Sequence, residues 1–185
     1  MTDPTQDILT DLEHPQIKYS TAWQRFFAVI IDGLILSPFV LIDSFNKTTW
    51  KSYPILAISF LITLAYKPFL ESRYGATLGK MAIKLTIVNA SYQKADIKNV
   101  ILRNTFEIVN RLLLAVVAVI TFTNPAFEDV DSLAGYSKLS NSEAGALAVT
   151  ISLSVLFLID AIFLIADRRR QSLHDKIGQT FVIQK

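Results

Sequence analysis

The feature that most constrains this chain is a set of four apolar segments, each about as long as a membrane is thick. A helix rises about 1.5 Å per residue, so it needs about 20 mostly apolar residues to cross roughly 30 Å of hydrocarbon. The candidate spans cover residues 21–42, 53–70, 107–123 and 144–166. The second is the shortest, because Lys67 and Pro68 interrupt its apolar run, and a re-entrant segment is the alternative there. Four such segments predict an all-α membrane protein, a four-helix transmembrane bundle, rather than a soluble core.

The composition excludes several classes of protein. Hydrophobic residues make up 51% of the chain and charged residues 18%, against roughly 25% charged in an ordinary soluble domain. This balance argues against a disordered chain and against a typical soluble enzyme. The absence of cysteine excludes a disulfide, a cysteine-based metal site and a thiol nucleophile. His14 and His174 lie far apart and no nucleophile–base pair stands out, so we expect no enzyme, no cofactor and no metal.

The distribution of basic residues predicts how the spans are oriented. Most of the 18 lysines and arginines lie before the first span, between the second and third, or after the fourth, whereas Lys47, Lys51 and Lys138 lie in the other loops. Basic residues in short loops remain cytoplasmic, so both termini are predicted to be cytoplasmic. Residues 1–20 lack an apolar signal-peptide core and are predicted to form a cytoplasmic extension. The arginine run 168–170 is expected to contact anionic lipid headgroups rather than nucleic acid.

The loop between the second and third spans is predicted to have structure of its own. Residues 82–88 are rich in β-branched side chains and indicate a strand, whose simplest partner is the short run 180–183. Asp96 is placed to cap a following helix. A basic face that includes Lys98 and Arg103 predicts that this helix is amphipathic, lies at the membrane interface and leads into the third span. We therefore expect a small cytoplasmic β element beside an interfacial helix.

Ionisable residues inside the apolar segments are the strongest functional candidates. Each costs roughly 2.5–3.5 kcal/mol to insert, so it usually faces the interior of a helix bundle. Asp32 and Asp160 lie about halfway into the first and fourth spans, and Arg111 lies one turn after Glu107 at the start of the third. A carboxylate in a low dielectric binds a proton more readily than in water, so both aspartates are candidate ion or proton sites. Arg111 is the candidate internal counter-charge, and Glu107 is grouped with it as a counter-charge or gate residue. The alternative is a structural ion-pair cluster that holds the helices together.

A glycine pattern at residues 75–80 resembles a phosphate-binding loop only superficially. The Walker motif has four residues between its glycines and a Ser or Thr after the lysine. Here three residues separate Gly75 from Gly79, and Met81 follows Lys80. The pattern therefore predicts a tight turn whose glycines allow close packing against a helix.

Several motifs, in this order along the chain, resemble the RDD family of bacterial membrane proteins, which is named for one arginine and two aspartates. The stretch 22–32, with Arg25 near its start and Asp32 at its end, resembles the first family motif. Further stretches that resemble family motifs are 74–80, 85–88, 102–104 and 170–180. The resemblance covers about residues 19–183 and predicts one RDD-like membrane domain over residues 21–185.

The resemblance implies a small protein of the bacterial cytoplasmic (inner) membrane, for which a transport role including cation/proton exchange has been suggested. It assigns the named arginine to Arg25 and the first aspartate to Asp32. The second aspartate corresponds best to Asp175, with Asp160 as the alternative. Because Asp175 follows the fourth span, we expect it to dock on Arg25 as a cytoplasmic gate or latch.

Taken together, the residues and the resemblance favour transport of a small cation or solute in exchange for protons. Four spans leave little room for a pathway within one subunit, which predicts a homo-oligomer. The first alternative is a non-transporting scaffold that recruits a partner through the basic residues of its cytoplasmic surface, Lys80, Lys84, Lys94 and Lys98. A membrane enzyme acting on lipid is a weaker alternative, because the sequence offers no nucleophile–base pair or metal cluster.

Overall fold

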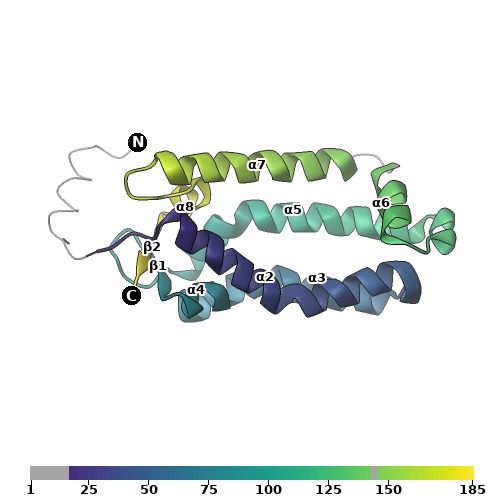
Figure 1. The fold of residues 1–185 in the computed structure, drawn as a ribbon, viewed down its shortest axis with the longest axis horizontal. Coiled ribbons are helices and arrows are strands. Elements are labelled where there is room, and N and C mark those ends of the chain that lie inside the picture. Colours follow the sequence, from purple (N-terminus) through teal and green to yellow (C-terminus); the bar gives the residue numbers. More distant parts are fainter. Residues whose placement is uncertain (1–16, 143–145) are drawn as a thin grey trace.

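The computed structural model describes residues 17–142 and 146–185, so most of the predicted extension 1–20 lies outside the described residues. Four helices run along the long axis of the molecule in Figure 1: α2 (Ala22–Phe45), α3 (Tyr53–Tyr74), α5 (Ile97–Thr123) and α7 (Ala146–Ala166). The α3–α5 connection and the segment after α7 meet at one end of the molecule. The α2–α3 and α5–α7 connections lie at the other end.

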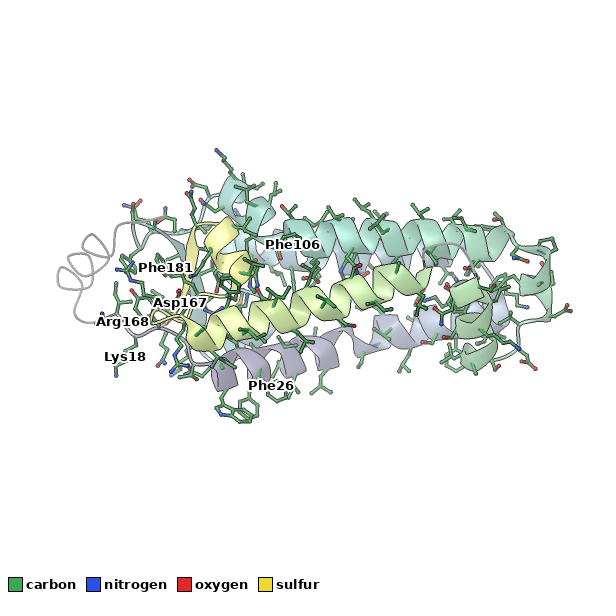
Figure 2. All side chains as sticks on the ribbon, turned by 90° about the horizontal axis from the view of Figure 1, so that it is seen from above. Lys18, Phe26, Phe106, Asp167, Arg168 and Phe181 are labelled. Atoms are coloured by element: carbon green, nitrogen blue, oxygen red, sulfur yellow. The ribbon has the colours of Figure 1, made fainter. Side chains whose placement is uncertain are left out.

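Within the described residues, three helical stretches are long and apolar enough to cross a membrane, judged by length and composition: Ala22–Trp50, Tyr53–Tyr74 and Ile97–Thr123. The first joins α2 to a π-helical turn, η1 (Asn46–Trp50). Large apolar side chains on the outside of these helices are exposed, as lipid-facing side chains are, and Figure 2 shows Phe26 pointing away from the bundle. The predicted span 144–166 corresponds to α7, where the apolar stretch found is the shorter Ser154–Ala166. A fourth crossing therefore stays a prediction.

Two helices are longer than the apolar pattern indicates. Helix α3 continues through Pro68 to Tyr74, and Gly75 ends it in the left-handed conformation (φ 75°). Helix α5 begins at Ile97, so the predicted interfacial helix and the predicted third span form one continuous helix. The expectation that Arg103 belongs to an exposed basic face is wrong, because this side chain is buried (4% exposed) among carboxylates.

A two-stranded sheet closes the end where the chain returns after α7. Strand β1 (Leu85–Asn89) pairs antiparallel with β2 (Thr180–Gln184). The strand begins later than residue 82 because the preceding residues form the short helix α4 (Leu78–Ala82). The inner face of the sheet packs on the first turn of α5, and together they form a small apolar core of Leu85, Ile87, Ala95, Val100 and Val182. This core fixes the C-terminal segment against the α3–α5 connection.

The opposite end carries elements that the sequence pattern did not indicate. A 3-10 helix, η2 (Pro125–Asp129), and helix α6 (Leu133–Ser142) follow α5. Phe122 stacks on Phe127 with ring centroids 4.4 Å apart, and the Lys51 ammonium donates to the Glu128 carbonyl at 2.6 Å. These contacts join η2 to the α2–α3 connection.

Helix α4 packs so closely against α2 that the contact position in α4, Gly79, has no room for a side chain. Thr77 caps α4, and Gly79 is the second residue of this helix. A Cβ atom placed on Gly79 would lie 2.1 Å from the Ala28 carbonyl oxygen and 2.8 Å from the Asp32 carboxyl carbon. The predicted role of this glycine in close helix packing therefore has a specific partner, the Ala28–Asp32 face of α2.

Gly79→Ala is expected to lower the stability of the folded protein by about 1–3 kcal/mol, because α4 must move away from α2. Thermal unfolding in detergent, followed by tryptophan fluorescence, measures this as a lower Tm. Gly33→Ala is the matched control, since nothing lies within 4 Å of a Cβ at Gly33. Equal Tm values for the two variants would contradict the close packing of α4.

Candidate functional site

A buried carboxylate, Asp175, lies between two arginines from different helices. Asp175 is on the short helix α8 (Leu173–Ile177) and is fully buried. It forms ion pairs with Arg25 of α2 and Arg103 of α5. Burial by itself would raise the pKa of Asp175, but Arg103, His174 and Arg25 hold it well below its usual range. The carboxylate is therefore ionised at neutral pH and ties three elements together.

The local sequence sets the geometry of this contact. Ser172 and Asp175 form a capping box that starts α8. The Arg25 guanidinium also donates to Ser20 Oγ at 2.8 Å and to the Arg170 carbonyl at 2.6 Å. Because Arg170 has a left-handed backbone (φ 55°), the chain turns sharply after α7 and presents this carbonyl to Arg25. The expected contact between Arg25 and Asp175 is present, and its role as a gate stays a prediction.

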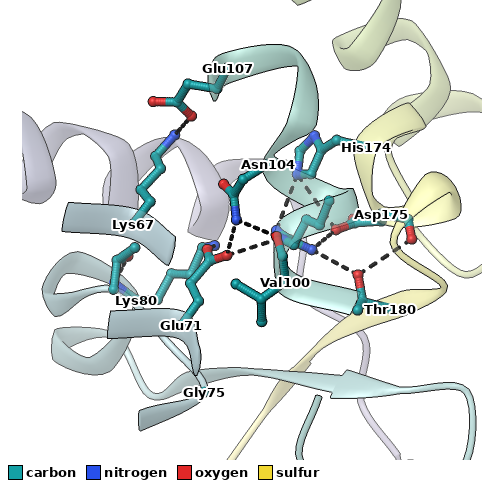
Figure 3. A network of polar contacts seen from close by, with 12 residues as sticks. Lys67, Glu71, Gly75, Lys80, Val100, Asn104, Glu107, His174, Asp175 and Thr180 are labelled. Carbon is teal, nitrogen blue, oxygen red and sulfur yellow. Dashed lines mark hydrogen bonds and ion pairs between the residues drawn. The ribbon is translucent and has the colours of Figure 1, made fainter. Parts of the chain in front are cut away.

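A second buried carboxylate, Glu71, continues the network into α3. Its oxygens accept from Lys80 Nζ at 2.6 Å, from Asn104 Nδ2 at 2.9 Å and lie 3.4 Å from Arg103 Nε. Burial lowers the pKa of Lys80 to about 8, although Glu71 opposes that shift. Figure 3 shows Glu71, Asn104, His174 and Asp175 converging from α3, α5 and α8.

Asp32 is held by neutral donors. The Tyr66 hydroxyl donates to its Oδ1 at 2.6 Å, the Thr77 hydroxyl to its Oδ2 at 2.7 Å and the Gly79 amide to its Oδ1 at 2.7 Å. Arg111, the predicted counter-charge, forms no ion pair with Asp32 in the described part of the chain. A metal cation at Asp32 would have to displace these donors. This geometry supports Asp32 as an anchor of α3 and α4 on α2.

The other predicted residues form two separate pairs. Asp160 accepts from the backbone amide of His174 at 3.0 Å and contacts its Nδ1 at 2.7 Å. Glu107 contacts Lys67 Nζ at 2.5 Å and Arg111 Nη2 at 2.9 Å. Arg111 is therefore the partner of Glu107 and, among the described residues, of neither aspartate.

These groups surround a cavity of about 810 Å³ between α3, α5 and α7. Its charged lining residues are Lys67, Glu71, Lys80, Arg103, Glu107, Arg111, Asp160 and His174. The remaining wall is mostly apolar, with Phe106, Leu114, Leu156, Leu158 and Leu173. A volume of this size is in the range of small-molecule sites in proteins. Within the described residues, no group of three His, Asp or Glu side chains suits a metal ion.

The structure distributes the predicted site residues over three places. Asp160, Glu107 and Arg111 line the cavity, Arg25 and Asp175 close the network behind it, and Asp32 lies apart among its donors. The buried carboxylate Glu71 and its partner Arg103 were not among the predicted site residues. Both are charged residues next to long apolar runs, and this position in the sequence could have marked them as candidates.

The long apolar helices and the charged network between them define a multi-pass helical membrane protein. The chain belongs to the RDD family, because the model of that family matches residues 19–179. This match confirms the resemblance seen in the sequence motifs. No curated protein and no solved structure gives a significant match to the chain.

Asp175→Asn is expected to destabilise the fold by roughly 3–5 kcal/mol, because it leaves two buried guanidinium groups without their shared carboxylate. Thermal or denaturant unfolding in detergent measures the loss. The exposed residue Asp129 on η2 provides the control, since Asp129→Asn makes the same chemical change outside the network. A shift in Asp175→Asn no larger than in the control would show that the ion pairs contribute little.

The same ion pairs predict a pH dependence of stability. Because the pKa of Asp175 is lowered in the folded state, its contribution is complete above the unfolded value of about 3.9 and is lost as the pH falls below it. Wild-type Tm is therefore expected to fall between about pH 5 and pH 3 more steeply than that of Asp175→Asn. Parallel curves for the two proteins would contradict this assignment.

Proposed function

We propose that this RDD-family protein moves a small cation or solute across the bacterial cytoplasmic membrane in exchange for protons. The observation that carries the proposal is the charged cavity between the apolar helices. Ionisable side chains in membrane segments usually mark solute or proton pathways. Here Glu107, Asp160 and His174 line one cavity, and carboxylate and imidazole groups are suited to exchange protons there.

The proposed orientation places the sheet and α8 on the cytoplasmic side. Lys18, Lys84, Lys94, Lys98 and the arginines 168–170 gather at this end of the chain, whereas the opposite end carries Glu128, Asp129 and Asp131. Figure 2 shows Lys18, Asp167 and Arg168 together at the strand end. The positive-inside tendency of short loops supports a cytoplasmic location for that end.

The residues have distinct proposed roles. Asp160 exchanges a proton with water or solute in the cavity. His174 positions the Asp160 carboxylate through two contacts. Glu107 sets the charge of the wall between Lys67 and Arg111. The buried pairing of Arg25 with Asp175 latches the C-terminal segment behind the cavity.

Flux in proteoliposomes tests the proposal. Wild-type protein is reconstituted with a pH-sensitive dye inside, a proton gradient is imposed, and sodium, potassium or lithium is added outside. Wild type is expected to dissipate the gradient on addition of a transported cation. Asp160→Asn is expected to lose at least tenfold in rate, because the amide cannot carry a proton, whereas the exposed control Asp129→Asn retains the rate.

The variants separate the possible outcomes. Loss of flux in Asp160→Asn with retention in Asp32→Asn assigns the pathway to the cavity. If flux is lost only in Asp32→Asn, and this variant keeps the wild-type Tm, the proton site would be Asp32 in the first span. Absence of any response from folded wild type would argue against cation/proton exchange.

The scaffold alternative has one observation in its favour and one against it. Lys84, Lys94 and Lys98 are exposed near the strand end and form a basic surface for an acidic partner. Lys80, the fourth member of the predicted surface, instead pairs with buried Glu71. A homo-oligomer also remains part of the proposal, on the argument that one small bundle has little room for a pathway.

A further inference from the structure

One polar side chain in the cavity has no hydrogen-bond partner among the described residues. Asn110, in the middle of α5, is 8% exposed and lines the cavity. No hydrogen bond to its amide comes from any residue that the structure describes. The described side chains contain no fully enclosed polar atom without a partner, so the Asn110 amide must keep its access through the cavity. An unpaired amide at membrane depth costs several kcal/mol, and a ligand group in the cavity would satisfy it.

The charged residues near Asn110, which are Lys67, Glu107 and Arg111, carry one more positive than negative charge. Glu107 is shared by Lys67 and Arg111, which contact different oxygens of the same carboxylate. All three side chains are about one-third exposed, so they face the cavity instead of the protein interior. Two cations on one carboxylate leave a net charge of +1 that favours an anionic group.

Another part of the cavity wall is apolar. Leu114 lies one turn beyond Asn110 on α5, and Leu156 and Leu158 line the cavity from α7. The wall thus has a charged part, with Lys67 and Arg111, and an apolar part with the three leucines, while Asp160 of α7 contacts His174 in the same lining. A ligand that matches both parts must itself be amphipathic.

We infer that this cavity binds a single-chain anionic amphiphile, with its carboxylate or phosphate between Lys67 and Arg111 and its apolar chain against Leu114, Leu156 and Leu158. The Asn110 amide donates a hydrogen bond to the anionic group. Charge-assisted bonds to Lys and Arg are the strongest available to such a group. A volume of about 810 Å³ suits one chain of ligand in the range of small-molecule sites.

The inference rests on the proposed function only in placing the ligand in the same cavity. It takes the solute branch of that proposal, in place of the cation branch, and gives the solute as an anionic amphiphile. Its test measures binding and not flux. A protein that binds the amphiphile but shows no flux would therefore support the site and contradict transport.

Native mass spectrometry of the purified full chain in an uncharged detergent tests the site. The probes are palmitate, phosphatidylglycerol, phosphatidylcholine and hexadecyltrimethylammonium, each added at the same concentration. Wild type is expected to retain one palmitate and to retain the other three at least tenfold less. Preferential retention of phosphatidylglycerol would assign the site to a two-chain membrane lipid and overturn the single-chain inference.

Variants tie binding to the named residues. Arg111→Gln and Asn110→Leu are each expected to weaken palmitate binding by roughly tenfold or more, whereas Arg111→Lys retains most of it. Lys138→Gln is the matched control, because it removes one positive charge from exposed α6 outside the cavity. Wild-type Tm in each variant establishes folding.

Two results would overturn the inference. One is equal retention of palmitate and of the cationic hexadecyltrimethylammonium by wild type, which would show that the cavity does not select charge. The other is unchanged palmitate binding in folded Arg111→Gln and Asn110→Leu, which would place any bound amphiphile elsewhere.

Discussion

The structure depends on one buried carboxylate, Asp175, and on the two arginines that neutralise it. A buried charge without a partner is strongly unfavourable, so Arg25 on α2 and Arg103 on α5 must both meet α8. That requirement brings the C-terminal segment back to the start of α2 and places β2 beside β1. It also brings His174, the neighbour of Asp175, to Asp160 on α7. These ion pairs therefore join α2, α5 and α8, and the apolar core beside them holds the sheet on α5.

The same contacts connect the structural network to the candidate site. Arg103 contacts both Asp175 and Glu71, and Glu71 pairs with Lys80. Arg103, Glu71 and Lys80 all line the cavity. The same charged side chains thus hold the helices together and form part of the cavity wall. From the sequence alone, the membrane charges could be either an ion or proton site or a structural ion-pair cluster. In the structure, some charged residues of the network hold the helices together and others line the cavity.

The general architecture could be predicted from the sequence because it follows from local patterns. Apolar runs indicate the spanning helices, β-branched residues indicate the pairing of β1 with β2, and the chain order of the motifs indicates the family. Partners of the charged residues could not be predicted in the same way. Arg103 belongs to a basic pattern typical of an exposed helix face. In the structure it is buried and forms ion pairs with two carboxylates from distant elements. Asp32 accepts from Tyr66, Thr77 and Gly79 and, among the described residues, forms no ion pair with Arg111. Such pairings depend on tertiary contacts and not on sequence spacing.

We infer that Asp175 latches the C-terminal segment onto the first span through its ion pair with Arg25. A double-mutant cycle of Arg25→Gln and Asp175→Asn, measured as unfolding free energies in detergent, tests it most directly. Residues that share a buried ion pair are expected to show an interaction energy of about 1–3 kcal/mol, so the double variant should be less destabilised than the sum of the single variants. Additive effects of the two substitutions, within about 0.5 kcal/mol, would contradict the latch.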